Sequence, residues 1–256
     1  MTGFLSSQLI TSKSNPQFRR WLDLLNTQGI REHGLYLLSG EKLVHEMIQQ
    51  RPQEIVSVLV PEKQPTSLDL RDFKIFELSH ELFSPLDELG TKKPMAVCKL
   101  PIIENEDLKT EPVEKVVVSA LQDPSNVGAL VRASLAFGVQ RLILLKESAF
   151  PFLPKSVKAS SGTVTQMKFS RGPSIHEISS DPAMQKGLLV LDQEGQSISD
   201  FQWPKTFRLL IGEEGRGLPL GLRSSSALRI PISNDVESLN AVTAASVALF
   251  LANQKS

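Results

Sequence analysis

The chain has 256 residues, of which 41% are hydrophobic and 22% are charged, and its formal net charge at pH 7 is zero. This composition is typical of a folded globular protein and excludes the disordered and fibrous classes. No apolar run approaches the roughly 20 residues that a membrane-spanning helix needs, so we expect no membrane partner.

One cysteine, Cys98, excludes an intrachain disulfide and favours a reducing compartment. The N-terminal residues have no sustained apolar stretch, so we expect no secretory signal and a cytoplasmic location. The histidines are His33, His45, His80 and His176, and none has metal-ligand spacing to the cysteine. We therefore expect no metal.

Positive and negative side chains are equal in number within residues 1–100 and within residues 101–256. Neither part has the basic excess that is typical of nucleic-acid binders. Local patches count for more than totals, and one such patch contains Lys13, Arg19, Arg20 and Arg31. Lys92 and Lys93 form another, and each patch taken alone is equally consistent with a solvated surface.

Residues 1–100 alternate helical and extended patterns and predict a small α/β domain. Asn15 can cap a helix whose first turn holds Pro16. The predicted helices are 15–28, 41–50 and 79–83, and the predicted strands are 35–38, 55–60, 74–77 and 95–100. Residues 101–115 are acidic, contain two prolines and lack periodicity, which predicts a linker.

From residue 116 to residue 256 strands alternate with helices, which predicts a second domain with a largely parallel sheet. The predicted strands are 116–121, 141–145, 164–169, 188–191, 207–211 and 228–230, and the predicted helices are 127–137, 154–160, 175–184, 219–224 and 239–253.

Three segments of this second domain each pass from an apolar stretch through small polar residues into a helical pattern: Leu121 to Gly138, Leu209 to Pro219 and Ile230 to Ser246. In open α/β sheets ligands bind where strand ends give way to such loops, so the three segments predict one composite site. The glycines of the second segment follow GxxGxG, which is neither the dinucleotide fingerprint nor a Walker motif.

Several side chains in these segments have alternative interpretations. Asn126 is either a helix N-cap or a site residue, and Ser238 is a good N-cap. Arg132 lies in an otherwise apolar helix, where it either snorkels to water, pairs with a carboxylate or binds a phosphate. Asn240 makes either a local backbone bond or a ligand contact.

Together, in this order and spacing, the three segments resemble the signature motifs of the SpoU (TrmH-type) RNA 2′-O-ribose methyltransferases of the SPOUT superfamily. The stretches that carry the resemblance are Asp123 to Gly128 with Arg132, Gly212 to Leu218 with Glu214, and Ile230-Pro231 followed by Ser238-Leu239-Asn240. The stretches 10–16 and 37–42 resemble, more loosely, the RNA substrate-binding domain that precedes the catalytic domain in many ribosomal-RNA members.

The resemblance implies an α/β catalytic domain with a deep trefoil knot, which is an exception to the rule that chains do not knot. It implies S-adenosylmethionine as the cofactor, a homodimer with each site completed across the interface, and no metal. The reaction implied is methyl transfer to a ribose 2′-hydroxyl, for which positioning and a nearby base matter most. The implied substrate is RNA, most of all ribosomal RNA, with transfer RNA as an alternative.

The site residues implied by the resemblance fall into three groups. Those assigned to catalysis are Asn126, Arg132, Glu214, Ser238 and Asn240. Those assigned to the cofactor are Leu191, Asp192, Gly195, Ile211, Gly212, Glu213, Gly215, Gly217, Ile230, Ile232, Ser238 and Leu239. Those assigned to RNA are Lys13, Arg19, Arg20, Arg132 and Lys158.

The sequence departs from the family pattern at Lys158, where arginine is usual, so a bidentate phosphate contact is lost. The stretch 92–96 replaces a more polar one and puts the RNA target in doubt. Two other functions stay open: a non-catalytic RNA-binding or ribosome-assembly protein, and a nucleotide-dependent oxidoreductase. Against the oxidoreductase, the sequence lacks the glycine fingerprint with which such proteins bind their dinucleotide cofactor.

Overall fold

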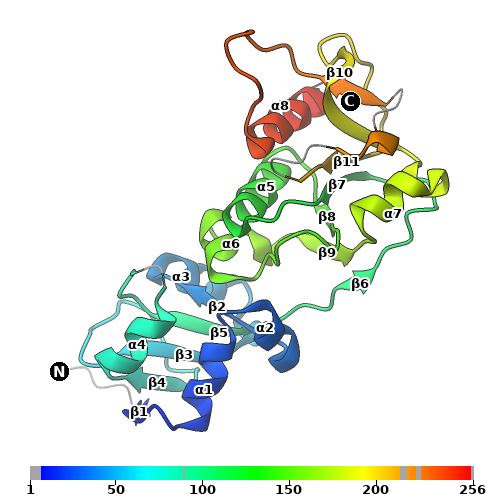
Figure 1. Cartoon of the computed structure of the whole chain (residues 1–256). Coiled ribbons are helices and arrows are strands. Elements are labelled where there is room, and N and C mark those ends of the chain that lie inside the picture. The colour runs from blue at the N-terminus through cyan, green and yellow to red at the C-terminus, as the bar shows by residue number, and fades with distance from the viewer. Residues whose placement is uncertain (1–6, 89, 214–217, 223–225, 255–256) are drawn as a thin grey trace. The chain divides into compact units, whose positions relative to one another are not determined.

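The computed structural model describes residues 7–88, 90–213, 218–222 and 226–254. These residues form two compact units (Figure 1). The first unit comprises the residues up to 102 together with 152–162, and the second comprises 103–151 together with the residues from 163 onward. Among the described residues, no helix is long and apolar enough to cross a membrane.

The first unit contains a five-stranded mixed sheet. Its strands are β1 (Ser7–Ile10), β2 (Leu35–Ser39), β3 (Ile55–Pro61), β4 (Ile75–Leu78) and β5 (Met95–Lys99), in the order β1-β4-β3-β5-β2. β1, β4 and β3 are parallel, whereas β5 runs antiparallel to both β3 and β2. The helices are α1 (Pro16–Asp23), α2 (Thr27–His33), α3 (Glu41–Gln50), α4 (His80–Leu86) and a 3-10 turn, η1 (Pro52–Glu54).

The first predicted helix is correct at its start and wrong at its end. Asn15 caps α1, because its side chain accepts a hydrogen bond from the backbone N–H of Gln17 at 2.8 Å. A second cap, Asn26, accepts from the N–H of Gly29 at 2.9 Å and starts α2 in a new direction. Two caps in one predicted helix therefore produce two short helices.

The second unit contains a seven-stranded sheet in which every pair of neighbouring strands is parallel. Its order is β12 (Ala227–Arg229), β10 (Leu188–Ser197), β11 (Phe207–Ile211), β7 (Lys115–Ser119), β8 (Arg141–Leu144), β9 (Lys168–Arg171) and β6 (Glu104–Asn105). The predicted parallel α/β sheet is thus confirmed. Because all strands run the same way, all their carboxyl ends meet at one edge.

The helices that accompany this sheet are α5 (Pro124–Ala136), α7 (Ile175–Ser180) and α8 (Ala241–Gln254), with 3-10 turns η2 (Thr163–Thr165), η3 (Pro182–Gln185) and η4 (Leu220–Leu222). α5 packs against α8. Phe137, directly after α5, makes an edge-to-face ring contact with Phe250 of α8 at a centroid distance of 6.0 Å.

Helix α6 (Pro154–Ala159) belongs to the first unit, although the sequence placed it in a continuous second domain. The reason is the packing of its neighbours, since the buried ring of Phe152 lies 4.8 Å from that of Tyr36 on β2. α6 itself packs against β2. Contacts between residues so distant in sequence leave no local pattern.

The segment predicted to be a linker, 101–115, is instead tied into the second sheet from residue 103 onward. β6 pairs with β9 at the edge of the sheet. The guanidinium of Arg208, only 2% exposed, donates through Nη1 to the backbone carbonyls of Leu108 at 3.1 Å, Thr110 at 2.8 Å and Lys186 at 3.0 Å. Burial lowers the pKa of Arg208, and these carbonyl contacts compensate its buried charge.

Glu41 stabilises the first unit in a pH-dependent way. Its carboxylate accepts from the N–H of Ser67 at 3.1 Å, from the hydroxyls of Ser67 and Thr66 at 3.0 Å each, and pairs with Lys93 at 3.2 Å. These contacts, with the Ser67 N–H first, lower the pKa of Glu41 from 4.5 to about 2. The ionised carboxylate of Glu41 therefore stabilises the folded state.

We expect Glu41→Gln to lower the free energy of unfolding at pH 7. Because the pKa is lowered in the folded state, the wild-type advantage is complete above about pH 4.5 and is lost as the pH falls toward about 2. Chemical denaturation of both proteins across this range measures the difference. Glu46→Gln, which removes one exposed ion pair, is the control that changes little. A Glu41→Gln effect of equal size at pH 3 and pH 7 would contradict this account.

Candidate functional site

A pocket of about 670 Å³ lies at the carboxyl ends of β10 and β11, beside the start of α8. This volume is within the range of small-molecule sites. Its apolar lining is Leu191, Leu210, Ile211, Leu218, Leu239, Ala241 and Ala244, and its polar lining is Asp192, Gln193, Glu194, Gly212, Glu213, Ser238 and Asn240. The side chains of Asp192, Glu194 and Glu213 supply three carboxyl groups. The lining residues that the structure describes include no lysine or arginine, and this charge favours a ligand with positive charge.

One wall is the end of β10, which departs from regular pairing with β12. The register shifts between Leu191 and Gln196. Gly195 makes this path possible, because a Cβ there would lie 2.5 Å from the backbone carbonyl atoms of Ala227. Asp192 fixes the turn by accepting from the N–H of Glu194 at 2.9 Å.

The opposite wall is the start of α8. The sequence predicted a helix from residue 239 with Ser238 as a good cap, but α8 begins at Ala241. Asn240 is the residue that caps it, since its Oδ1 accepts from the N–H of Val242 at 2.9 Å and of Thr243 at 3.3 Å. The side chain of Asn240 thus makes the local backbone bonds that were one of its two readings, while the residue also lines the pocket.

The two walls are joined by a hydrogen bond. The side-chain amide of Gln193 donates to the backbone carbonyl of Glu237. This bond connects the turn after Leu191 to the segment that leads into α8. One side of the pocket is therefore formed by two loops that are far apart in sequence and joined by this bond.

Helix α5, which carries the first motif, starts at the carboxyl end of β7. Asp123 caps it by accepting from the N–H groups of Ser125 at 2.8 Å and Asn126 at 3.0 Å. Asn126 therefore lies in the first turn of the helix, and its interpretation as the N-cap is wrong. Arg132 lies on the exposed side of the same helix. Neither Asn126 nor Arg132 lines the pocket.

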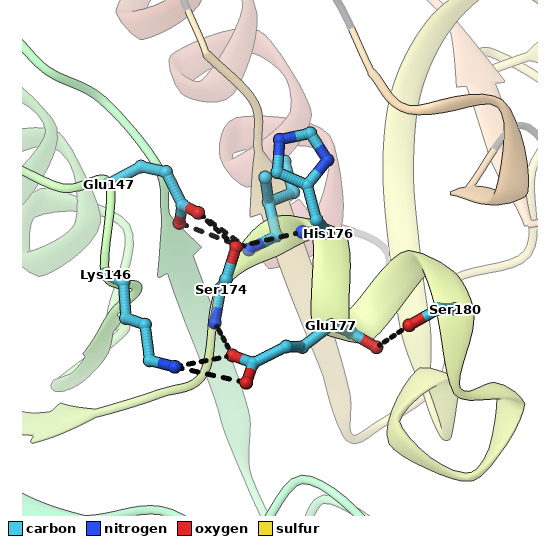
Figure 2. A network of polar contacts seen from close by, with 7 residues as sticks. Lys146, Glu147, Ser174, His176, Glu177 and Ser180 are labelled. Carbon is cyan, nitrogen blue, oxygen red and sulfur yellow. Dashed lines mark hydrogen bonds and ion pairs between the residues drawn. The ribbon is translucent and has the colours of Figure 1, made fainter.

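The loops after β8 and β9 are held at the same edge of the sheet by a polar network (Figure 2). Lys146 pairs with Glu177 at 2.9 Å, and Glu147 accepts from the hydroxyl of Ser174 and from the N–H of Ile175. Ser174 and Glu177 form a capping box at the start of α7. The Ser174 N–H, followed by Lys146, lowers the pKa of Glu177. The network fixes the start of α7, and none of its residues lines the pocket.

The pocket brings together eight of the residues that the sequence assigned to catalysis or to the cofactor: Leu191, Asp192, Ile211, Gly212, Glu213, Ser238, Leu239 and Asn240. Gly195, Ile230 and Ile232 are outside its lining. The assigned residues Glu214, Gly215 and Gly217 lie outside the described residues. Lys13, Arg19, Arg20 and Lys158 are exposed in the first unit.

Sequence reasoning missed several lining residues: Gln193, Glu194, Leu210, Leu218, Ala241 and Ala244. Two of them had a usable signal. Ala241 and Ala244 are three residues apart at the start of the last helix, so they share one face. Their small side chains leave room beside the strand ends.

Comparison with known proteins places this site in a family. Residues 114–250 match the model of the SpoU rRNA Methylase family. The chain belongs to this family. The match contains all three motifs and the whole lining of the pocket, so the resemblance seen in the sequence is confirmed.

Two relatives and one solved structure illustrate the similarity. The chain is 38% identical to "Ribosomal RNA small subunit methyltransferase G 2" of Syntrophobacter fumaroxidans over 94% of its own length and 48% of the relative, so it spans about half of that protein. It is 27% identical to the "23S rRNA (guanosine(2553)-2'-O)-methyltransferase RlmP" of Bacillus subtilis, over 94% and 97% of the two chains. The crystal structure of an AdoMet-bound rRNA methyltransferase from Sinorhizobium meliloti matches with a TM-score of 0.76 at 22% identity, covering 97% of this chain and 98% of that chain, and shows the same fold.

Proposed function

We propose that this SpoU-family protein transfers a methyl group from S-adenosylmethionine to a ribose 2′-hydroxyl of RNA, with ribosomal RNA as the substrate class. The observation that carries the proposal is the pocket at the ends of β10 and β11, built from two of the three family motifs. The Bacillus subtilis relative, which matches along nearly its whole length, is named for this reaction on ribosomal RNA.

The chemistry of the pocket fits the cofactor. Leu191, Ile211 and Leu239 offer apolar contacts for an adenine ring, and the carboxylates of Asp192 and Glu213 suit hydroxyl groups and positive charge. Gly212 leaves no room for a side chain, since an added Cβ would lie 2.9 Å from the side chain of Leu218. When bound, S-adenosylmethionine supplies a methyl group on a positively charged sulfur.

The remaining chemistry belongs to the side chains of the motifs. Arg132 is assigned to the phosphate of the target nucleotide, because guanidinium binds phosphate in a bidentate manner. An arginine in a protein keeps its proton, so phosphate binding suits it better than a role as the base. Asn126, Glu214, Ser238 and Asn240 are assigned to orienting the nucleotide. Capping by Asn240 uses its carbonyl oxygen and leaves the amide group to donate.

The proposal includes a homodimer. Arg132 is outside the lining of the pocket in its own chain, as expected if a second copy supplies this residue to each site. α8 bears the 45% exposed ring of Phe250, which suits helix packing between copies. Light scattering at micromolar concentration that gave the mass of a monomer would argue against a shared site.

The proposal also includes a trefoil knot and a cytoplasmic location. The strand order supports the knot, because the chain leaves β12 at one edge of the sheet and returns past β10 and β11 to pack α8 on α5. The cytoplasmic location rests on the single, buried cysteine and on the RNA substrate.

We expect Ala244→Phe to weaken binding of S-adenosylmethionine at least tenfold, about 1.4 kcal/mol, because the ring would occupy the pocket. The matched control is Thr243→Phe, which places the same ring on an exposed position of α8. Isothermal titration calorimetry measures both. Equal affinities of the two variants for S-adenosylmethionine would show that the cofactor does not bind in this pocket.

The reaction is tested by incubating wild-type protein with methyl-labelled S-adenosylmethionine and unmodified transcripts of ribosomal RNA and transfer RNA. Label in ribosomal RNA is the expected result. Label only in transfer RNA would correct the substrate class. Cofactor binding without transfer to either RNA would favour a non-catalytic RNA-binding protein.

A further inference from the structure

A group of lysines gathers at one end of the first unit, around the β2 edge of its sheet. We call this group the lysine surface; it consists of Lys42, Lys92, Lys93, Lys155 and Lys158, all exposed. Three separate segments supply it: the start of α3, the loop before β5, and α6. β2 and β5 bring the first two together, because Ser39 pairs with Met95 and the N–H of Gly40 donates to the carbonyl of Pro94 at 3.1 Å.

Residues 91–93, which precede β5, contact two carboxylates. Asp87, only 7% exposed, accepts from the N–H and hydroxyl of Thr91 at 3.0 Å each and from the N–H of Lys92 at 2.6 Å. Lys92 consequently has φ of +52°, a left-handed conformation that lysine rarely adopts. Glu41 pairs with Lys93 at 3.2 Å. Asp87 and Glu41 thus fix the backbone and side chain through which Lys92 and Lys93 are placed.

Helix α6 joins the same edge from the other part of the sequence. Lys155 and Lys158 are three residues apart and exposed, so they share one face, while Ser156 and Val157 are buried. Gly162, which follows α6, lies so close to the first turn of α3 that an added Cβ would be 2.8 Å from a methyl of Leu43. This contact brings α6 to the helix that carries Lys42.

The positive charge of the lysine surface is only partly compensated. Within the described residues, its ammonium groups pair with two carboxylates, at 3.2 Å to Glu41 and at 3.8 Å to the exposed Glu46. No aspartate or glutamate occurs between Ser148 and Pro173 or between Gly90 and Ile103. In a chain with equal numbers of acidic and basic residues, this is a local excess of one sign.

We propose that the lysine surface binds the phosphate backbone of the RNA substrate. The identity of the partner as RNA rests on the proposed function, whereas the location rests on the geometry above. The surface is distinct from the patch of Lys13, Arg19 and Arg20, which follows β1. β1 and β2 are the two opposite edges of the same sheet (Figure 1). Lysine ammonium groups bind phosphates as point charges and carry no base specificity.

The test compares two triple variants that remove the same charge from different places on the first unit: Lys42→Ala/Lys155→Ala/Lys158→Ala, and Lys13→Ala/Arg19→Ala/Arg20→Ala. Filter binding to an unmodified large-subunit ribosomal RNA transcript is measured at several salt concentrations. Each lost phosphate contact lowers the slope of log affinity against log salt by roughly 0.7–0.9. We expect the β2-edge variant to lose about two units of slope and roughly tenfold or more in affinity.

A third variant, Lys42→Arg/Lys155→Arg/Lys158→Arg, keeps the charge and is expected to keep the slope. Unchanged affinity and slope in the β2-edge alanine variant would overturn the proposal. A circular dichroism spectrum and a urea denaturation curve that match those of the wild type verify that each variant is folded. The measurement needs no turnover, so failure of the methylation assay and failure of this surface are separate results.

Discussion

Arg132→Ala is expected to lower the rate of methyl transfer to RNA by about 10²- to 10³-fold, the largest effect on activity that we predict. The reason is that the reaction depends on holding the nucleotide so that its 2′-hydroxyl faces the methyl donor. Loss of a guanidinium that binds the phosphate removes this placement. Single-turnover kinetics with saturating S-adenosylmethionine measures the effect on the transfer step.

Two controls separate this role from a structural one. Cofactor affinity is expected to stay unchanged, because Arg132 is assigned to the phosphate of the target nucleotide and not to the cofactor. Arg132→Lys is expected to retain part of the rate, since lysine keeps the charge and loses the bidentate contact. A rate for Arg132→Ala equal to that of wild type would rule out the assigned role.

Arg208→Met is expected to reduce the free energy of unfolding by about 3 kcal/mol or more, the largest effect on stability. The substitution keeps an apolar stem of similar length but leaves the carbonyls of Leu108, Thr110 and Lys186 without this donor. Each buried acceptor left unpaired costs about 1–3 kcal/mol. Denaturation by urea, followed by circular dichroism, measures the loss.

The matched control is Arg229→Met, which removes the same charge from an exposed position at the end of β12. It is expected to change stability by less than about 0.5 kcal/mol. Proteolysis of the segment 103–115 provides a second readout, because Arg208 is what fastens it to β11. Equal stability of the two variants would mean that these carbonyls find other partners.

Local signals in the sequence predicted much of the fold. Asn15 followed by Pro16 gave the correct start of α1, and the alternation after residue 116 gave the parallel sheet. Local signals failed where distant contacts decide. Phe152 belongs to the first unit because its ring packs against that of Tyr36. The segment 103–115 packs with the second sheet because Arg208 donates to its carbonyls. β1 was missed because its pairing with β4 has no counterpart in the local pattern.

In the candidate site too, some features were predicted from the sequence and others depend on contacts between distant residues. The pocket gathers Leu191, Ile211 and Leu239 from segments far apart in sequence, as the family motifs predicted, and their roles toward the cofactor remain predictions. Motif spacing could not distinguish Gly195, whose lack of a side chain serves the approach of β10 to Ala227. It also could not show that Asn240 caps α8, because that depends on where the helix begins.

The most direct test of the central claim is to identify the methylated nucleoside. Unmodified ribosomal RNA is incubated with wild-type protein and labelled S-adenosylmethionine, digested to nucleosides and analysed by mass spectrometry. The account predicts label in a nucleoside whose ribose carries the methyl group, and loss of that label with Arg132→Ala. Label on a base, with the ribose unmodified, would contradict it.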